Sequence, residues 1–150
     1  MNSFTIISAV YLLISCFSAN AQQLTDTVTI TRIVDGDTFH GISSKRGVKV
    51  KYRPIGMNTP EMARYGREAQ PYAQEATDYM NTLIKKGDLV RVEYDVQTKD
   101  QFGRDLVYAY TMSGIFINAD LVTAGWAEVA TYPPNVKYVC LLYTSPSPRD

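Results

Sequence analysis

Cysteine is scarce in this chain, which has two among 150 residues, and neither is placed to cross-link a fold. Cys16 lies in an apolar N-terminal stretch and Cys140 lies near the other end, so we expect no intramolecular disulfide even in an oxidising compartment. An excess of positive charge is also absent, because 15 Lys and Arg balance 15 Asp and Glu. Overall basicity therefore gives no reason to expect nucleic-acid binding, and any such binding must be local.

Internal repeats and domain linkers are absent, and a hydrophobic content of 45% is enough for one domain with a core. The chain also lacks a comfortable transmembrane span, which needs about 20 apolar residues. Its longest apolar stretch, residues 6–14, is followed by the small-x-small sequence Ala19-Asn20-Ala21. This pattern predicts a signal peptide over residues 1–21 and an exported protein, periplasmic or extracellular, although Lys and Arg are missing before the apolar core.

An alternative for the same stretch is lipid attachment. Residues 13–16, Leu-Ile-Ser-Cys, resemble a bacterial lipobox, in which Cys16 is lipidated and becomes the new N-terminus. The protein would then be anchored to a membrane through Cys16, and otherwise no membrane contact is expected. Both alternatives place the mature domain outside the cytoplasm.

Hydrophobic periodicity predicts five short strands and one principal helix. Alternating or β-branched residues mark the strands, and apolar or small residues at helical spacing mark the helix. A shorter helix over residues 119–124, capped by Asn118, is expected after the last strand. The predicted strands cover residues 28–34, 38–42, 48–53, 89–96 and 106–110, and the principal helix covers residues 68–86.

Five strands with a helix between the third and fourth, and a short helix after the fifth, predict an α+β protein built on an OB-fold β-barrel. The domain is expected to span residues 22–138. Residues 139–150 contain Pro146 and Pro148, which are incompatible with an amphipathic helix running through them. We therefore interpret 139–150 as a non-native or truncated tail.

The stretch from Tyr52 to Glu61 has the composition of an active site. It places an arginine, an amide, a hydroxyl and a carboxylate at the end of a strand and its turn, where Pro60 restricts the backbone. Asp35-Gly36-Asp37-Thr38 lies upstream, and residues 100–104 supply a second arginine downstream. Paired arginines with oxygen ligands suit phosphodiester chemistry assisted by a hard cation.

Structural interpretations exist for the same residues. Asp35-Gly36-Asp37 is typical of a tight turn, Arg104 of a surface arginine after a glycine turn, and Glu61 of a carboxylate at a turn or helix start. Lys49 and Lys51, which alternate with apolar residues, are explained by the solvated face of a half-buried strand.

Three segments together resemble the signature of the thermonuclease, or staphylococcal-nuclease-like, family. They are residues 35–38, residues 53–61 and residues 100–106, and they occur in the order found in that family. The similarity runs from about residue 28 to residue 138. It implies a calcium-dependent nuclease acting on DNA and also on RNA. Single-stranded DNA or breathing duplex is expected to be favoured, a monomer is expected, and no protein partner is inferred. Members of this family continue into a further helix near residue 138, which we therefore expect to be missing here.

The resemblance also implies a ligand set for Ca²⁺. Asp37 would supply a carboxylate, Asn58 a second ligand, and Thr59 its backbone carbonyl, with water completing the coordination. Oxygen-only ligation is what a hard cation requires. Asn58 stands where aspartate is usual in the family, so we expect weaker calcium binding.

The implied catalytic residues are Arg53, Glu61 and Arg104. Glu61 would activate or orient the attacking water, and the two arginines would grip the scissile phosphate. At the substrate-contacting positions, Gln101 and Phe102 replace a Lys-Tyr pair, and residues 131–133 depart from a tyrosine-rich segment. Tyr132 is the substitute expected to bind substrate there.

Three functions fit the sequence to different extents. The first is a secreted calcium-dependent nuclease. The second is a non-catalytic OB-fold module that binds nucleic acid, which Asn58 and the altered substrate-contacting positions make credible. A structural or adhesive exported domain leaves the two arginines and Glu61 without a role.

Overall fold

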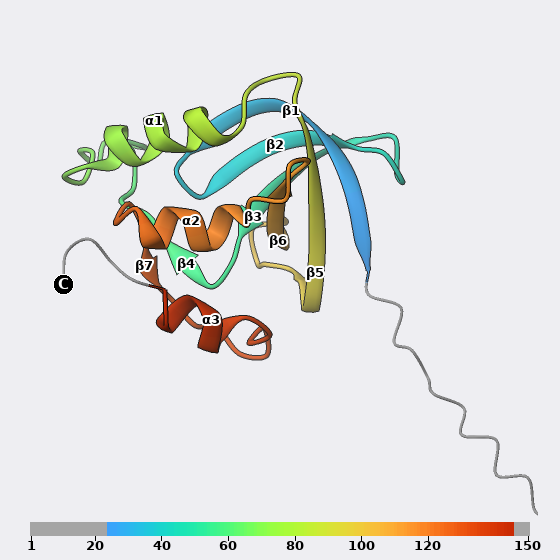
Figure 1. Cartoon of the computed structure of the whole chain (residues 1–150). Coiled ribbons are helices and arrows are strands. Elements are labelled where there is room, and N and C mark those ends of the chain that lie inside the picture. Colours follow the sequence, from blue (N-terminus) through green and yellow to red (C-terminus); the bar gives the residue numbers. More distant parts are fainter. Residues whose placement is uncertain (1–23, 146–150) are drawn as a thin grey trace, which may run out of the picture.

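A closed five-stranded barrel forms the body of the protein in the computed structural model, which describes residues 24–145 (Figure 1). The predicted signal peptide, including Cys16, lies outside the described residues. Around the barrel the strand order is β1-β2-β3-β6-β5, and β1 pairs with β5 to close it. The predicted α+β class and the barrel are confirmed. Its strands are β1 (Thr25–Asp35), β2 (Thr38–Ser43), β3 (Lys49–Pro54), β5 (Leu89–Lys99) and β6 (Asp105–Thr111).

One pair of barrel strands is parallel, and this pair matters for the site. Strand β3 runs parallel to β6, with Tyr52 opposite Asp105 and Arg53 opposite Leu106, whereas the other barrel pairings are antiparallel. Arg104 immediately precedes β6. The parallel register therefore brings Arg104 next to Arg53, although the two residues are far apart in the sequence.

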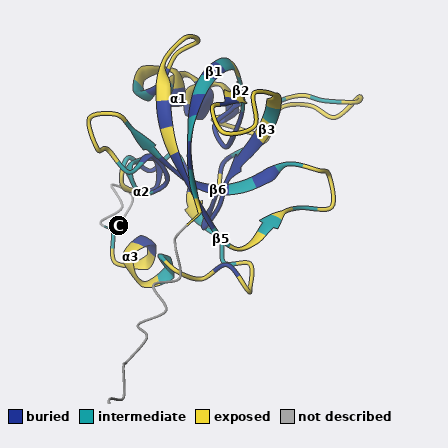
Figure 2. Ribbon diagram, turned by 90° about the vertical axis from the view of Figure 1, so that its right-hand side faces the viewer, coloured by how far each residue is buried: buried dark blue, intermediate teal, exposed yellow. Residues whose placement is uncertain are grey.

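The core fills the barrel and the space beneath the helices (Figure 2). Phe39 and Tyr52 stack in the barrel with ring centroids 5.2 Å apart, and neither is exposed. Gly41 is required in β2, because a Cβ there would lie 2.2 Å from a methyl carbon of Val28 and 2.9 Å from the carbonyl oxygen of Thr29. A side chain at this position would force β1 and β2 apart.

Helix α1 (Ala73–Leu83) packs against β1 and α2 (Ile117–Thr123), and buries Ala76 and Met80. It begins at Ala73, later than the predicted residue 68. Pro71 has no N–H to donate, and Tyr72 has a left-handed backbone with φ of 66°. None of the helices among residues 24–145 is long and apolar enough to span a membrane.

Asn118 does not cap α2, contrary to the prediction. It lies inside the helix, fully buried, where its Oδ1 accepts a hydrogen bond from the backbone N–H of Ala109 at 2.9 Å. Its Nδ2 donates to the carbonyl oxygen of Ile55 at 2.7 Å. Because buried polar groups need partners, the Asn118 amide fixes α2 to β6 and to the chain that leaves β3.

A two-stranded sheet and a third helix complete the domain. Strand β4 (Met57–Asn58) pairs with β7 (Glu128–Val129), which holds the chain just after β3. The structure differs from the sequence interpretation at residues 139–143, where it forms α3 (Val139–Tyr143). Leu142 of α3 is 1% exposed, and a Cβ on Gly56 would lie 2.4 Å from its Cδ1. Pro146 and Pro148 follow the helix in sequence and so do not interrupt it.

Candidate active site

Arg53 lies at the centre of the candidate site. It is near the end of β3 and only 9% exposed, although it continues the face of the exposed Lys49 and Lys51. Its Nη1 forms an ion pair with the carboxylate of Asp37, and its Nη2 donates to Oδ1 of Asn58 at 2.8 Å. The guanidinium therefore brings together two of the residues predicted to bind metal.

Asp37 occupies the turn between β1 and β2 and is 1% exposed. Its Oδ2 accepts a hydrogen bond from the backbone N–H of Thr59 at 3.0 Å, and its Oδ1 accepts one from the Thr38 hydroxyl at 3.2 Å. A Cβ on Gly36 would lie 2.9 Å from the Thr59 side chain. The β1–β2 turn is thus packed directly against the bend at Thr59, so it does more than reverse the chain.

Asp35 is a second buried carboxylate that was not among the predicted site residues. It is 2% exposed, forms an ion pair with Arg64, and accepts a hydrogen bond from the backbone N–H of Asp37 at 3.2 Å. Burial raises the pKa of Asp35, and the positive charge of Arg64 opposes that shift. The signal in the sequence was the pair of aspartates around Gly36, which is equally typical of a simple turn.

Arg104 is held by its neighbour Asp100. The Nε of Arg104 donates to one carboxylate oxygen of Asp100 at 2.7 Å, and its backbone N–H donates to the other at 2.9 Å. Burial opposes ionisation of Asp100, but these hydrogen bonds prevail and lower its pKa. A terminal nitrogen of Arg104 lies 3.4 Å from the Thr38 hydroxyl. Asp100 therefore orients the second arginine toward the turn that carries Asp37.

The two arginines are close enough to affect each other. Burial, and after it the positive charge of Arg104, lower the pKa of Arg53, whereas the charges of Asp35 and Glu61 oppose that shift. Two neighbouring cations repel each other, and a bound anion would relieve that repulsion. A phosphate group is one such anion.

Glu61 lies at the exposed edge of this group. Its backbone N–H donates to Oε1 of Gln70 at 2.7 Å, and its carbonyl oxygen accepts from the backbone N–H of Gln70 at 2.9 Å. Between residues 24 and 145, no hydrogen bond or ion pair engages its carboxylate. The structure does not bring this carboxylate into contact with Asp37 or Asn58.

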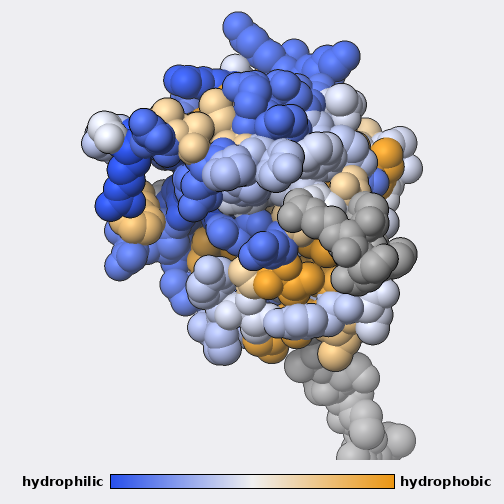
Figure 3. Space-filling model, turned by 90° about the vertical axis from the view of Figure 1, so that its left-hand side faces the viewer, coloured by the Kyte–Doolittle hydropathy of each residue, from blue (hydrophilic) through white to orange (hydrophobic). Residues whose placement is uncertain are grey.

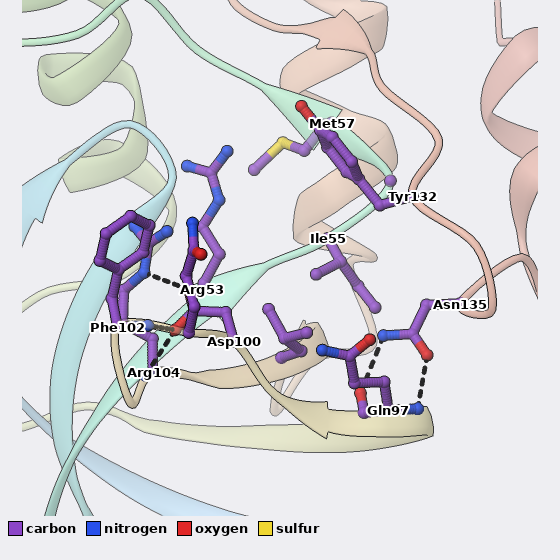
Figure 4. Close-up of a pocket in the computed structure, with 12 residues that line it drawn as sticks. Arg53, Ile55, Met57, Gln97, Asp100, Phe102, Arg104, Tyr132 and Asn135 are labelled. Atoms are coloured by element: carbon purple, nitrogen blue, oxygen red, sulfur yellow. Dashed lines mark hydrogen bonds and ion pairs between the residues drawn. The ribbon is translucent and has the colours of Figure 1, made fainter.

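A pocket of about 530 Å³ opens beside the arginines (Figure 4). Arg53 and Arg104 line it together with Phe102, and Tyr132 lies across the opening from them. Tyr132 thus shares a pocket with two of the predicted catalytic residues. Asn58 and Thr59 face a separate hollow of about 230 Å³, which Trp126 also lines.

The donor atoms near Arg53 suit a hard cation. The Asp37 carboxylate and the Asn58 amide oxygen converge, because both contact one guanidinium, and Thr59 is fixed to Asp37 through its N–H. Across the described residues, no group of three or more His, Cys, Asp or Glu side chains is arranged to hold a metal. A cation here would depend on amide and carbonyl oxygens besides carboxylates, which Ca²⁺ accepts.

The sequence model of the staphylococcal nuclease homologue family matches residues 51–145, and the chain belongs to this family. The match includes β3, Glu61, Arg104 and α3, and extends beyond the predicted domain end at residue 138.

Individual relatives agree with this assignment. The chain is 38% identical to the thermonuclease of Staphylococcus hyicus over 120 residues, which cover 80% of this chain and 68% of that protein. It is 35% identical over 117 residues to the thermonuclease of Staphylococcus intermedius, covering 78% and 67% of the two chains. It is 34% identical over 124 residues to endonuclease YncB of Bacillus subtilis (strain 168), covering 81% and 56%.

Proposed function

We propose that this chain is a calcium-dependent nuclease that hydrolyses phosphodiester bonds of DNA, with RNA as a second substrate. The observation that carries the proposal is the pairing of Arg53 and Arg104, which come from different parts of the barrel and line one pocket. Their forked N–H groups match pairs of phosphate oxygens. The names of the relatives, thermonuclease and endonuclease, support the same chemistry.

Asp37, Asn58 and the carbonyl of Thr59 would hold the calcium ion. When bound, the cation would offset negative charge on the phosphate during attack by water. Asp35 accepts a hydrogen bond from the backbone N–H of Asp37. Its proposed role is therefore to position the β1–β2 turn that carries the metal ligand Asp37. The Asn58 oxygen accepts from Arg53, which keeps this ligand beside the phosphate-binding groups.

The protein residues divide the reaction between them. Arg53 and Arg104 bind the non-bridging oxygens of the scissile phosphate and stabilise the charge that accumulates there. Glu61 accepts a proton from the attacking water as its oxygen bonds to phosphorus. The phosphorus–ester oxygen bond breaks, and the leaving oxygen takes a proton from solvent. An exposed carboxylate, with no ion pair among residues 24–145, is available for this task.

The test is degradation of heat-denatured DNA by the purified protein, with Ca²⁺ or with a chelator. We expect cleavage with Ca²⁺ and none with the chelator. Binding of DNA without cleavage in either condition would contradict the proposal. It would instead favour a non-catalytic binding module, the second function, to which the amide at Asn58 in place of a carboxylate points.

Export is also a proposal, which rests on the apolar stretch and the small-x-small site before residue 22. Calcium is plentiful outside cells, which fits a site with one carboxylate fewer. The mass of the mature protein separates cleavage after Ala21 from lipidation at Cys16.

Replacing Asn58 by aspartate is expected to lower the Ca²⁺ concentration for half-maximal cleavage by about tenfold. The new carboxylate keeps an oxygen facing Arg53 and adds one negative charge to the ligand set. Tenfold corresponds to about 1.4 kcal/mol, which lies between the water and protein-surface values for one charge pair. Calcium titration of the cleavage rate measures the effect, and Asn58→Ala, which should shift the dependence upward, is the control. An unchanged calcium dependence in Asn58→Asp would remove Asn58 from the ligand set.

A further inference from the structure

The chain that follows Glu61 forms a closed loop over residues 61–70, here termed the Glu61 loop. Glu61 and Gln70 are joined by two hydrogen bonds at its base. Near its tip, the backbone N–H of Arg67 donates to the carbonyl oxygen of Arg64 at 2.9 Å, and the reciprocal bond measures 3.2 Å. The loop therefore ends in a tight turn whose two central residues are Tyr65 and Gly66.

The backbone of this turn is unfavourable for tyrosine. Tyr65 has φ of 50° and Gly66 has φ of 80°, so both central residues are left-handed, as in a type I′ turn. Asn, Asp or Gly suits the first of these positions, whereas a bulky residue with positive φ is strained. The conformation of the turn therefore does not explain why a tyrosine occupies position 65.

Packing does not explain it either. Tyr65 has a relative exposure of 103%, and its ring makes no aromatic or cation–π contact with any residue from 24 to 145. An isolated exposed apolar residue is ordinary on a protein surface, but one that also strains the backbone has two unfavourable features. The ring is therefore available for a partner outside the chain.

The charged residues around the ring indicate the kind of partner. Arg64 and Arg67 flank the turn, and Arg64 is ion-paired to Asp35. Arg67 is exposed, with no ion pair in the described part of the chain, and is followed by the exposed Glu68. The segment before α1 lies at the left of Figure 1, and Figure 3 shows the molecule from that side. This face is mostly hydrophilic, with a smaller hydrophobic area in its lower part. An exposed aromatic ring between arginines is the combination that binds single-stranded nucleic acid by stacking and phosphate contact.

The loop is also close to the candidate site. Arg64 forms an ion pair with Asp35, which is directly behind Asp37, so the loop is fixed on the side of the ligand turn. Four residues of chain span at most about 14 Å, so Tyr65 lies within that distance of Glu61. At about 3.4 Å per stacked nucleotide, this places Tyr65 at most about four nucleotides from Glu61.

We propose that Tyr65 is a substrate-binding residue that stacks on an unpaired base of the strand being cleaved, while Arg67 contacts its backbone. The inference rests on the proposed nuclease function and adds a substrate property. The substrate property is a length dependence: strands long enough to reach the Glu61 loop bind better than short ones.

Tyr65→Asn tests this directly, because asparagine suits the turn and removes the ring. We expect KM for a single-stranded oligonucleotide to rise about tenfold with kcat nearly unchanged, since one stacked base contributes about this factor or more. KM for a mononucleotide p-nitrophenyl phosphodiester, which is too short to reach the loop, should not change. Tyr65→Phe should restore the KM, and the melting temperature of Tyr65→Asn should equal or exceed that of the parent.

Tyr72→Asn is the matched control, because Tyr72 is also exposed and has φ of 66° but lies outside the Glu61 loop. Equal increases in KM for Tyr65→Asn and Tyr72→Asn would overturn the inference, and so would an unchanged KM in Tyr65→Asn. If the parent cleaves neither substrate, the nuclease proposal fails. Fluorescence anisotropy of a labelled oligonucleotide, with parent and Tyr65→Asn in chelator, then decides: weaker binding by the variant supports stacking, and equal binding refutes it.

Discussion

Replacing Arg104 by alanine is expected to lower kcat for DNA cleavage by about 10²- to 10³-fold, the usual loss when one positioned donor is removed from a developing negative charge. Arg104 is fixed by Asp100 through its Nε and lines the pocket beside Arg53. Its side chain is 24% exposed and lies outside the apolar core, so the fold should survive. Steady-state kinetics together with thermal melting separate loss of catalysis from loss of structure.

Two further variants test whether the effect is specific to the guanidinium of Arg104. Arg104→Lys should recover little activity, because an ammonium keeps the charge but cannot reproduce two parallel donors. Lys51→Ala removes an exposed cation from β3, the strand of Arg53, and should change kcat little. If Arg104→Ala keeps kcat within about threefold of the parent, Arg104 is a surface arginine, and the phosphate-binding pair does not exist.

Glu61→Gln is expected to lower kcat by about 10²-fold or more, because glutamine keeps the shape of glutamate but cannot accept the proton from water. The substitution should leave the fold intact, since the hydrogen bonds that close the Glu61 loop use the backbone of Glu61. KM should change little if the residue acts mainly in the transition state.

Glu68→Gln is the control, because Glu68 is an exposed carboxylate in the same loop. Its kcat should match the parent, which would exclude a general effect of the lost charge. A Glu61→Gln enzyme that retains more than about a tenth of the parental kcat at saturating Ca²⁺ would require another proton acceptor and would overturn the role proposed for Glu61.

Much of the barrel could be predicted because hydrophobic periodicity can be read within each strand or helix separately. Alternation in β3 correctly places Val50 and Tyr52 on the more buried side, although Val48 before the strand is 53% exposed. The small and apolar residues of α1 indicate its buried stripe. Asn118 shows where this reasoning stops. Asparagine before a helical pattern is typical of a cap, but its side chain instead bonds to Ala109 of the preceding strand β6 and to Ile55, 63 residues earlier in the sequence.

Some residues of the candidate site could likewise be predicted from the sequence, and others could not. Asp37, Arg53, Asn58 and Thr59 were selected from short segments, and the structure brings them into contact. The supporting roles of Asp35 and Asp100 depend on which arginine reaches each carboxylate, and this follows from tertiary packing. Tyr65 could not be singled out, because neither its exposure nor its backbone angle can be read from the sequence.

The parallel pairing of β3 with β6 has a consequence for how the chain acquires its activity. Three of the barrel pairings join strands that follow one another in the sequence, namely β1 with β2, β2 with β3, and β5 with β6. Arg53 and Arg104, in contrast, meet only when the distant strands β3 and β6 pair. Such non-local closure is entropically costly and tends to occur late in folding. On the proposed function, a newly made or partly unfolded chain in which β3 and β6 are unpaired holds Arg53 and Arg104 apart, and we expect it not to cleave nucleic acid. Recovery of cleavage during refolding would therefore report the pairing of β3 with β6 rather than the first collapse.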